Sequence, residues 1–247
     1  MKILKYIPII IAFFIISELQ AATFRPTNLS CEQITNPLGI DVRQPLLSWM
    51  LESSENGMHQ SAYEIIVSDS KASIDSNTGN LWNTGKLTSD ETVFIAYEGV
   101  ALKPFTRYFW KVRVYDQHGT PSPWSAVAWF ETAMLDATDW KAQWIGDVRQ
   151  QFERDEDFYQ DDPMPLLRKT FPANKTIAEA RLYICGLGYY EAYINGKKVG
   201  DHVLDPGWTA HREQALYVTY DITAMLQKGA NAVGVMLGNG HSRQVNA

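Results

Sequence analysis

An alternation of residue types over positions 108–115 constrains the fold more than any other feature of the sequence. Bulky apolar side chains recur there at every second position, and this period of two is typical of a β-strand. Leu102 and Pro104 precede the strand at the spacing of a tyrosine corner, in which a tyrosine hydroxyl bonds to the upstream backbone of a β-sandwich. One face of the strand carries Tyr108, Trp110, Val112 and Val114, and the other carries Phe109, Lys111, Arg113 and Tyr115.

Residues 23–134 contain further short strand patterns separated by turn signals. The segment SAYEIIVSDS places Tyr63, Ile65 and Val67 on one face and Glu64 on the other. PLLSWML, LWNTGKLTS and ETVFIAYEG add a compact apolar run and two more strands. Regularly spaced short strands predict an all-β sandwich. This part of the chain resembles a fibronectin type III or immunoglobulin-like module, and such a module alone implies no activity.

A second unit rich in β-strand patterns occupies residues 164–247. LLRKTF, ARLYICGLGYYEAYING, QALYVTYDI and NAVGVMLGNG read as strands, and Asn195-Gly196 predicts a two-residue type I′ hairpin turn. A short helix is expected in ITAMLQK, capped by Asp221 or Thr223 and ended by Gly229 in a left-handed conformation. The sequence therefore predicts two tandem β-sandwiches.

The amino-terminal segment and the net charge indicate where the protein acts and which partners it lacks. Residues 1–22 carry Lys2 and Lys5, then an apolar run, then Ala21 and Ala22, which is the order of a secretory signal peptide. The apolar run is shorter than the roughly 20 residues that a membrane span needs. We therefore expect a periplasmic or secreted protein, with no membrane attachment after cleavage. A net charge of −6 and the lack of a basic cluster argue against nucleic acid as a partner.

Two cysteines and an acidic segment give no clear site. Cys31 and Cys185 are too few for a disulfide framework and match no zinc spacing. We interpret them as buried apolar side chains, with a bridge between the units as the weaker alternative. Residues 135–163 form a predicted linker with an acidic loop. Paired carboxylates or a calcium loop are the functional interpretations of that loop, but a solvated surface segment is favoured because like charges repel.

Five segments together resemble a known family. They are LSCEQITNPLGIDVRQPLLSWML, LWNTGKLTS, FWKVRVYDQHGTPSPWS, WIG, and the long run from Gly186 to residue 240 that begins GLGYYEAYINGKKVGDHVLDPGW. They are similar to the amino-terminal region of bacterial α-L-rhamnosidases of the Bacteroidota type. The resemblance implies a fibronectin-like module followed by a jelly-roll-like sandwich. The second sandwich is expected to be incomplete, because family members continue past LGNG with Trp and further strands.

The resemblance also implies which chemistry this chain does not hold. The family carries its catalytic acid and base in a helical toroid further along the chain, and no amphipathic helical repeat occurs in this sequence. No catalytic residue is therefore assigned, and we expect this chain to be inactive alone. The expected function is the non-catalytic amino-terminal portion of a secreted α-L-rhamnosidase, which hydrolyses terminal α-L-rhamnosyl residues. The alternative is a free-standing protein that binds rhamnose-containing glycans. Its partners would be such glycans or the missing catalytic domain.

The segment 186–208 offers the candidate binding residues. A sugar site pairs exposed aromatic rings with polar side chains, and the second unit supplies Tyr189, Glu191, Tyr193, Asn195 and Trp208. Some related modules bind L-rhamnose with calcium, so the resemblance implies Asp201 and Asp205 as calcium ligands; no other cofactor is expected. On the strand, Tyr190, Ala192 and Ile194 should face the core. A packing role for the aromatic residues is favoured over binding.

Overall fold

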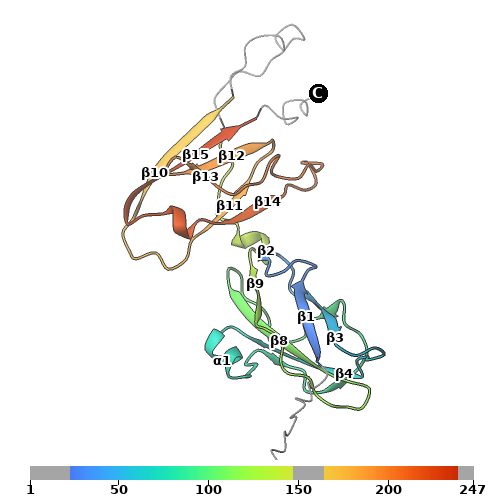
Figure 1. Ribbon diagram of the computed structural model, residues 1–247. Coiled ribbons are helices and arrows are strands. Elements are labelled where there is room, and N and C mark those ends of the chain that lie inside the picture. Colours follow the sequence, from blue (N-terminus) through green and yellow to red (C-terminus); the bar gives the residue numbers. More distant parts are fainter. Residues whose placement is uncertain (1–22, 147–163, 239–247) are drawn as a thin grey trace, which may run out of the picture.

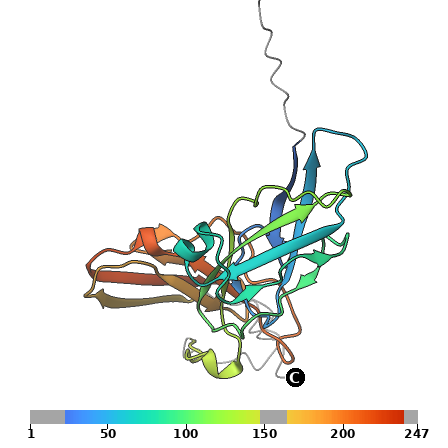
Figure 2. The same cartoon turned by 90° about the horizontal axis from the view of Figure 1, so that it is seen from below.

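The computed structural model describes residues 23–146 and 164–238, and within them the chain forms two β-rich units (Figures 1 and 2). The predicted signal peptide, the acidic loop and the last nine residues lie outside the described residues. The all-β prediction is confirmed. The first unit has its core in strands of residues 24–132, and the second has its core in strands of residues 166–237.

In the first unit, the described strands form two sheets. One has the order β1-β3-β7, and the other has the order β2-β9-β8-β4-β5 with β6 also paired to β4. Pairing is antiparallel except between β2 and β9. The strands are β1 Phe24–Cys31, β2 Leu38–Ile40, β3 Leu46–Ser53, β4 Ala62–Ser68, β5 Trp82–Asn83, β6 Leu87–Thr88, β7 Ile95–Ala96, β8 Arg107–Tyr115 and β9 Ala128–Thr132.

The core of the first unit lies between these sheets, and the alternation in β8 accounts for it. Trp110, Val112 and Val114 are fully buried, as the period of two requires. The predicted tyrosine corner is present, because the Lys103 amide donates a hydrogen bond to the Tyr108 hydroxyl at 2.7 Å. One short helix, α1 Lys71–Asp75, was not anticipated; the Ser70 hydroxyl caps it by accepting from the Ser73 amide at 3.3 Å.

In the second unit, the described strands also form two sheets. The order of the larger is β10-β15-β12-β13, and the smaller pairs β11 with β14. The Asn195-Gly196 turn has φ of 51° and 80°, the left-handed values that a type I′ hairpin demands. The strands are β10 Leu166–Ala173, β11 Arg181–Cys185, β12 Tyr190–Ile194, β13 Lys197–Lys198, β14 Tyr217–Asp221 and β15 Gly229–Leu237.

The helix expected in ITAMLQK is a single 3-10 turn, Thr223–Met225. Isolated short helices are costly to nucleate, and Leu226 already returns to extended backbone. The N-cap residue is Ile222, so neither Asp221 nor Thr223 is the cap that was predicted; the Asp221 carboxylate, one residue earlier, accepts from the Thr223 amide at 2.9 Å. Gly229 has the expected left-handed φ of 97°, but the turn has already ended at Met225, so the prediction that Gly229 ends it is wrong and the residue opens β15 instead. Another short 3-10 turn, Ala137–Asp139, follows the first unit.

Both cysteines are free thiols, so the alternative of a bridge between the units is wrong. Cys31 is fully buried in the first core, and Cys185 is half-buried on β11. Burial raises the pKa of both thiols above the ordinary value, which makes them poor nucleophiles. Among the described residues, no helix is long and apolar enough to span a bilayer.

Candidate functional site

The predicted binding hairpin divides into an inner and an outer face, as its alternation requires. Tyr190, Ala192 and Ile194 are buried in the second core. Glu191 and Tyr193 lie on the outer face and are partly exposed. Tyr189, just before the strand, is also exposed. The prediction that these three residues are accessible to a ligand is therefore compatible with the geometry, and binding itself stays a prediction.

Glu191 already has two partners within the chain. One carboxylate oxygen accepts from the Tyr193 hydroxyl at 2.6 Å, and the other accepts from the Lys198 ammonium at 2.7 Å. These hydrogen bonds lower the pKa of Glu191, with the Lys198 contribution larger, so the carboxylate is charged at neutral pH. Its oxygens therefore fix the orientation of Tyr193 and Lys198.

Asn195 holds the hairpin turn. Its side-chain amide donates to the Met225 carbonyl at 3.0 Å and to the Asn231 side chain at 2.9 Å, and its oxygen accepts from the Ala232 amide at 2.9 Å. With donor and acceptor both used, this side chain has a structural role. Trp208 is different, because 73% of its surface is exposed on the loop after Gly207.

The two predicted calcium ligands lie on the loop 199–216. The Asp205 carboxylate accepts from the Tyr220 hydroxyl and pairs with His202 Nδ1 at 2.8 Å. Burial, followed by this hydrogen bond, raises the pKa of Tyr220 to about 12. Asp201 is exposed. The described residues include no cluster of three or more His, Cys, Asp or Glu side chains that could hold a metal, so calcium binding stays a prediction without a complete ligand set.

The best-defined constellation is the junction between the two units, which lie end to end (Figure 1). The small β11-β14 sheet forms it. Its inner side chains, including Leu182 and Val218, pack into the second core. Its outer side chains contact the first unit and the segment that follows it: Tyr183 meets Phe105 of the first unit at 5.4 Å between ring centroids, and Tyr217 meets Trp140, just after the first unit, at 5.9 Å. One sheet therefore serves both units.

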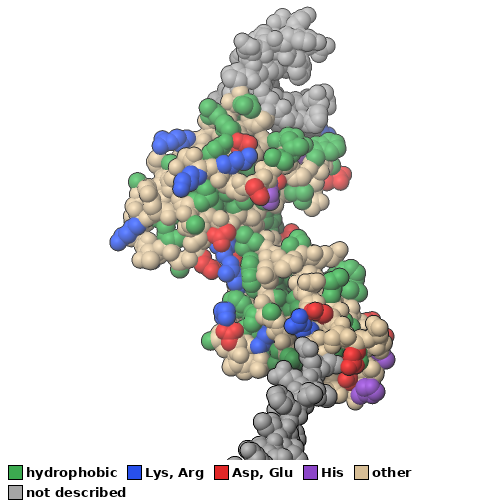
Figure 3. Space-filling model, in the orientation of Figure 1, with side chains coloured by type: hydrophobic (Ala, Val, Ile, Leu, Met, Phe, Trp, Pro, Cys, Tyr) green, Lys and Arg blue, Asp and Glu red, His purple; other side chains and the backbone are tan. Residues whose placement is uncertain are grey.

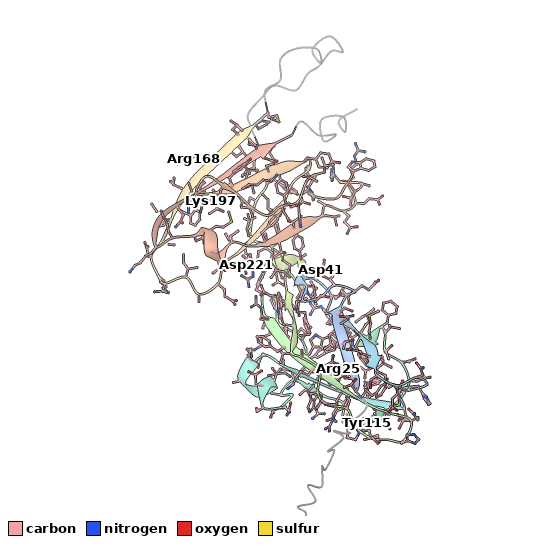
Figure 4. The ribbon with its side chains drawn as sticks, viewed as in Figure 1. Arg25, Asp41, Tyr115, Arg168, Lys197 and Asp221 are labelled. Carbon is pink, nitrogen blue, oxygen red and sulfur yellow. The ribbon has the colours of Figure 1, made fainter. Side chains whose placement is uncertain are left out.

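A buried ion pair lies at the centre of this junction. Arg181 from β11 donates to both carboxylate oxygens of Glu131 from β9, at 2.6 and 2.9 Å. The side chains are 8% and 6% exposed. Arg107 of β8 also donates to Glu131, at 2.9 and 3.1 Å. The hydrogen bonds to Glu131 raise the pKa of Arg181, so its guanidinium remains charged. Asp221, labelled in Figure 4, adds a second acid to Arg181 at 3.1 Å.

A glycine lets the backbones approach at the same junction. Gly39 of β2 has φ of 83°, and a Cβ added there would lie 2.3 Å from Thr219 Oγ1 of β14. A residue with a Cβ at this position would require β2 or β14 to shift, and its left-handed φ is one that L side chains rarely adopt. Sequence reasoning did not identify this junction, because Glu131 and Arg181 are 50 positions apart and no local pattern links them.

Beside the junction is a polar cavity of about 340 Å³. Its lining includes Asp41, His202, Gln214, Tyr217 and Thr219. Asp41 is the only carboxylate among those lining residues, whereas glycoside hydrolysis uses two opposed carboxyl groups. The cavity therefore offers polar contacts but no acid–base pair.

Two family models match the chain. The Rha78A-like N-terminal immunoglobulin domain matches residues 26–136, and the alpha-L-rhamnosidase N-terminal domain matches residues 175–247. A relative named alpha-L-rhamnosidase from Formosa agariphila is 40% identical over 220 residues, which cover 83% of this chain and 23% of the relative. Another relative of that name, from Streptomyces avermitilis, is 44% identical over 124 residues, covering 50% of this chain and 12% of the relative.

Solved structures agree. The alpha-L-rhamnosidase from Dictyoglumus thermophilum matches with a TM-score of 0.82 and 44% identity, covering 89% of this chain and 25% of that one. The enzyme from Aspergillus terreus matches with a TM-score of 0.72 and 29% identity, covering 89% and 24%. The chain thus spans about a quarter of the length of these proteins.

Proposed function

Because this chain carries the two N-terminal domains of the α-L-rhamnosidase family, we propose that it is the non-catalytic support of a longer secreted α-L-rhamnosidase. In this proposal the chain holds two β-sandwiches in one fixed orientation and presents them to the catalytic part. That part would hydrolyse terminal α-L-rhamnosyl residues of glycans. The chain alone would turn over no rhamnoside.

The junction is the observation that carries the proposal. Two units joined by an exposed linker move independently by default. Here the Glu131 carboxylate is held by guanidinium groups from both units, Arg107 on one side and Arg181 on the other. Bidentate pairing of a guanidinium with a carboxylate fixes direction as well as distance. The Gly39–Thr219 contact adds a steric constraint. A rigid joint suits a scaffold.

Distances between spin labels test this rigidity. Labels at Glu55→Cys in the first unit and Lys228→Cys in the second, on a Cys185→Ala background, report the separation of the units by pulsed electron resonance. Both sites are exposed, and the remaining thiol of Cys31 is fully buried. We expect one narrow distance distribution, which broadens in Glu131→Gln. A broad distribution in the parent protein would contradict the proposal.

An activity assay completes the test. The purified chain is incubated with a chromogenic α-L-rhamnoside, and a full-length relative such as the Formosa agariphila protein serves as the positive control. We expect hydrolysis by the relative only. Turnover by this chain at a rate comparable with that of the relative would refute a purely supporting role.

A further inference from the structure

The outer face of the β10-β15-β12-β13 sheet carries a straight row of residues across all its strands. The registers place Arg168 opposite Gly234, Gly234 opposite Tyr193, and Tyr193 opposite Lys198. Because Ala192 and Ile194 face the core, the alternation turns Tyr193 and its cross-strand neighbours outward. We call these four residues the outer row; Figure 4 labels Arg168, and Figure 3 shows basic side chains on this unit.

Gly234 leaves a gap in the outer row. A Cβ added there would meet only the Leu167 carbonyl oxygen at 3.9 Å and Tyr193 Cβ at 4.0 Å, which are ordinary contacts. A Cβ would therefore fit, and the glycine places no side chain between Tyr193 and Arg168. Neighbouring strands are about 4.8 Å apart, so the two residues stand roughly 10 Å apart. This separation accommodates a pyranose ring.

The walls of this gap differ in chemistry. Tyr193 is held by its hydroxyl, which donates to Glu191 at 2.6 Å. The charge of Glu191 is in turn matched by Lys198 at 2.7 Å. Arg168, by contrast, is exposed and forms no ion pair with any described residue. The gap is thus bounded by an oriented aromatic ring on one side and, on the other, by a guanidinium that no described residue pairs with.

We propose that the outer row binds an anionic sugar residue of a polysaccharide. The C–H face of the sugar packs against the Tyr193 ring, above Gly234, and Arg168 pairs with the carboxylate or sulfate of the same or the next residue. Aromatic rings suit sugar C–H groups, and guanidinium suits planar or multidentate anions. The inference rests on the proposed function, since it supposes that this support region belongs to an enzyme that acts on glycans.

Affinity gel electrophoresis or calorimetry with the whole chain tests the outer row. Polygalacturonate supplies carboxylates, a sulfated galactan supplies sulfates, and dextran is the neutral control. Gly234→Val fills the gap in a backbone conformation that valine accepts. Arg168→Gln removes the charge. The matched controls are Ala230→Val, exposed on the same strand four residues away, and Lys86→Gln, an exposed cation on the first unit.

We expect binding to one or both anionic glycans and none to dextran. Gly234→Val should abolish binding without lowering the unfolding temperature, and Arg168→Gln should weaken it about tenfold at low salt. Both controls should bind as the parent does. Absence of binding by the parent, equal losses in Arg168→Gln and Lys86→Gln, or normal binding by Gly234→Val would each overturn the proposal. The spin-label distances do not depend on any glycan, so the two proposals fail separately.

Discussion

Removing the shared carboxylate of Glu131 at the junction should cost more stability than removing its partner Arg181. In Glu131→Gln, Arg181 loses its main acid while its side chain remains 8% exposed. An uncompensated buried charge is expensive, because desolvation is no longer repaid by attraction. In Arg181→Met, Glu131 keeps the two hydrogen bonds from Arg107. Glu131→Gln therefore leaves a buried guanidinium without its main partner, whereas Arg181→Met leaves a carboxylate that is still paired.

The expected losses in the free energy of unfolding follow from this difference. Breaking a buried ion pair by removing one partner costs about 3–5 kcal/mol when a charge is left alone. Arg181 retains Asp221 at 3.1 Å and Glu179 at 3.5 Å, so we expect about 3 kcal/mol for Glu131→Gln. For Arg181→Met we expect about 1–2 kcal/mol, because one charged hydrogen-bond network survives and a methylene stem is retained.

Urea unfolding followed by tryptophan fluorescence measures both free energies of unfolding. A control variant is Arg25→Met, whose partner Glu52 is about half exposed; exposed pairs contribute only about 0–1 kcal/mol. The expected order of destabilisation is Glu131→Gln, then Arg181→Met, then Arg25→Met. If Glu131→Gln costs no more than Arg25→Met, the buried pair neither couples the units nor holds the joint rigid.

Three further outcomes follow from the same contacts. Gly39→Ala should destabilise the protein by about 2 kcal/mol or more and broaden the spin-label distances, because it adds a clash with Thr219 to a left-handed φ. Gly57→Ala is the control for φ alone, since Gly57 has φ of 78° and an added Cβ would meet no atom within 4 Å. Equal losses of stability in the two variants would show that the clash contributes nothing. Tyr108→Phe should cost about 1–2 kcal/mol in urea unfolding by removing the 2.7 Å corner bond; an unchanged midpoint would show that bond to be neutral. Limited proteolysis should cleave the second unit first, since its buried cluster is much smaller; survival of the second unit after loss of the first would contradict this.

The parts of the fold that sequence reasoning predicts are those set by local chemistry. The alternation around Trp110 specifies which face of β8 is buried, and the spacing from Leu102 to Tyr108 specifies the corner. Asn195-Gly196 specifies a turn because few residues accept two successive left-handed conformations. The 3-10 turn that replaced the expected helix marks the limit of such signals, since seven residues with helical composition do not repay nucleation without tertiary packing.

In the candidate sites, too, local sequence predicts which face a residue lies on but not which residues contact it across strands. Alternation placed Tyr193 and Glu191 on the outer face, but it could not reveal that Lys198 and Tyr193 already occupy both carboxylate oxygens. Those contacts depend on the register of the hairpin. Arg168 could not be identified as a partner of that face either, because β10 joins it through β15 from a distant part of the chain.

The junction also depends on contacts between residues that are far apart in the sequence. These contacts explain how the small β11-β14 sheet can be stable. Two strands alone are marginal in water, and among the described strands β11 and β14 pair only with each other. It is stabilised because both faces are covered, one by the second core and the other by the first unit. The arrangement ties the fold of the second unit to its contact with the first. A scaffold built in this way transmits orientation from one sandwich to the next, because the sheet that closes the second core is also the surface on which the first unit rests.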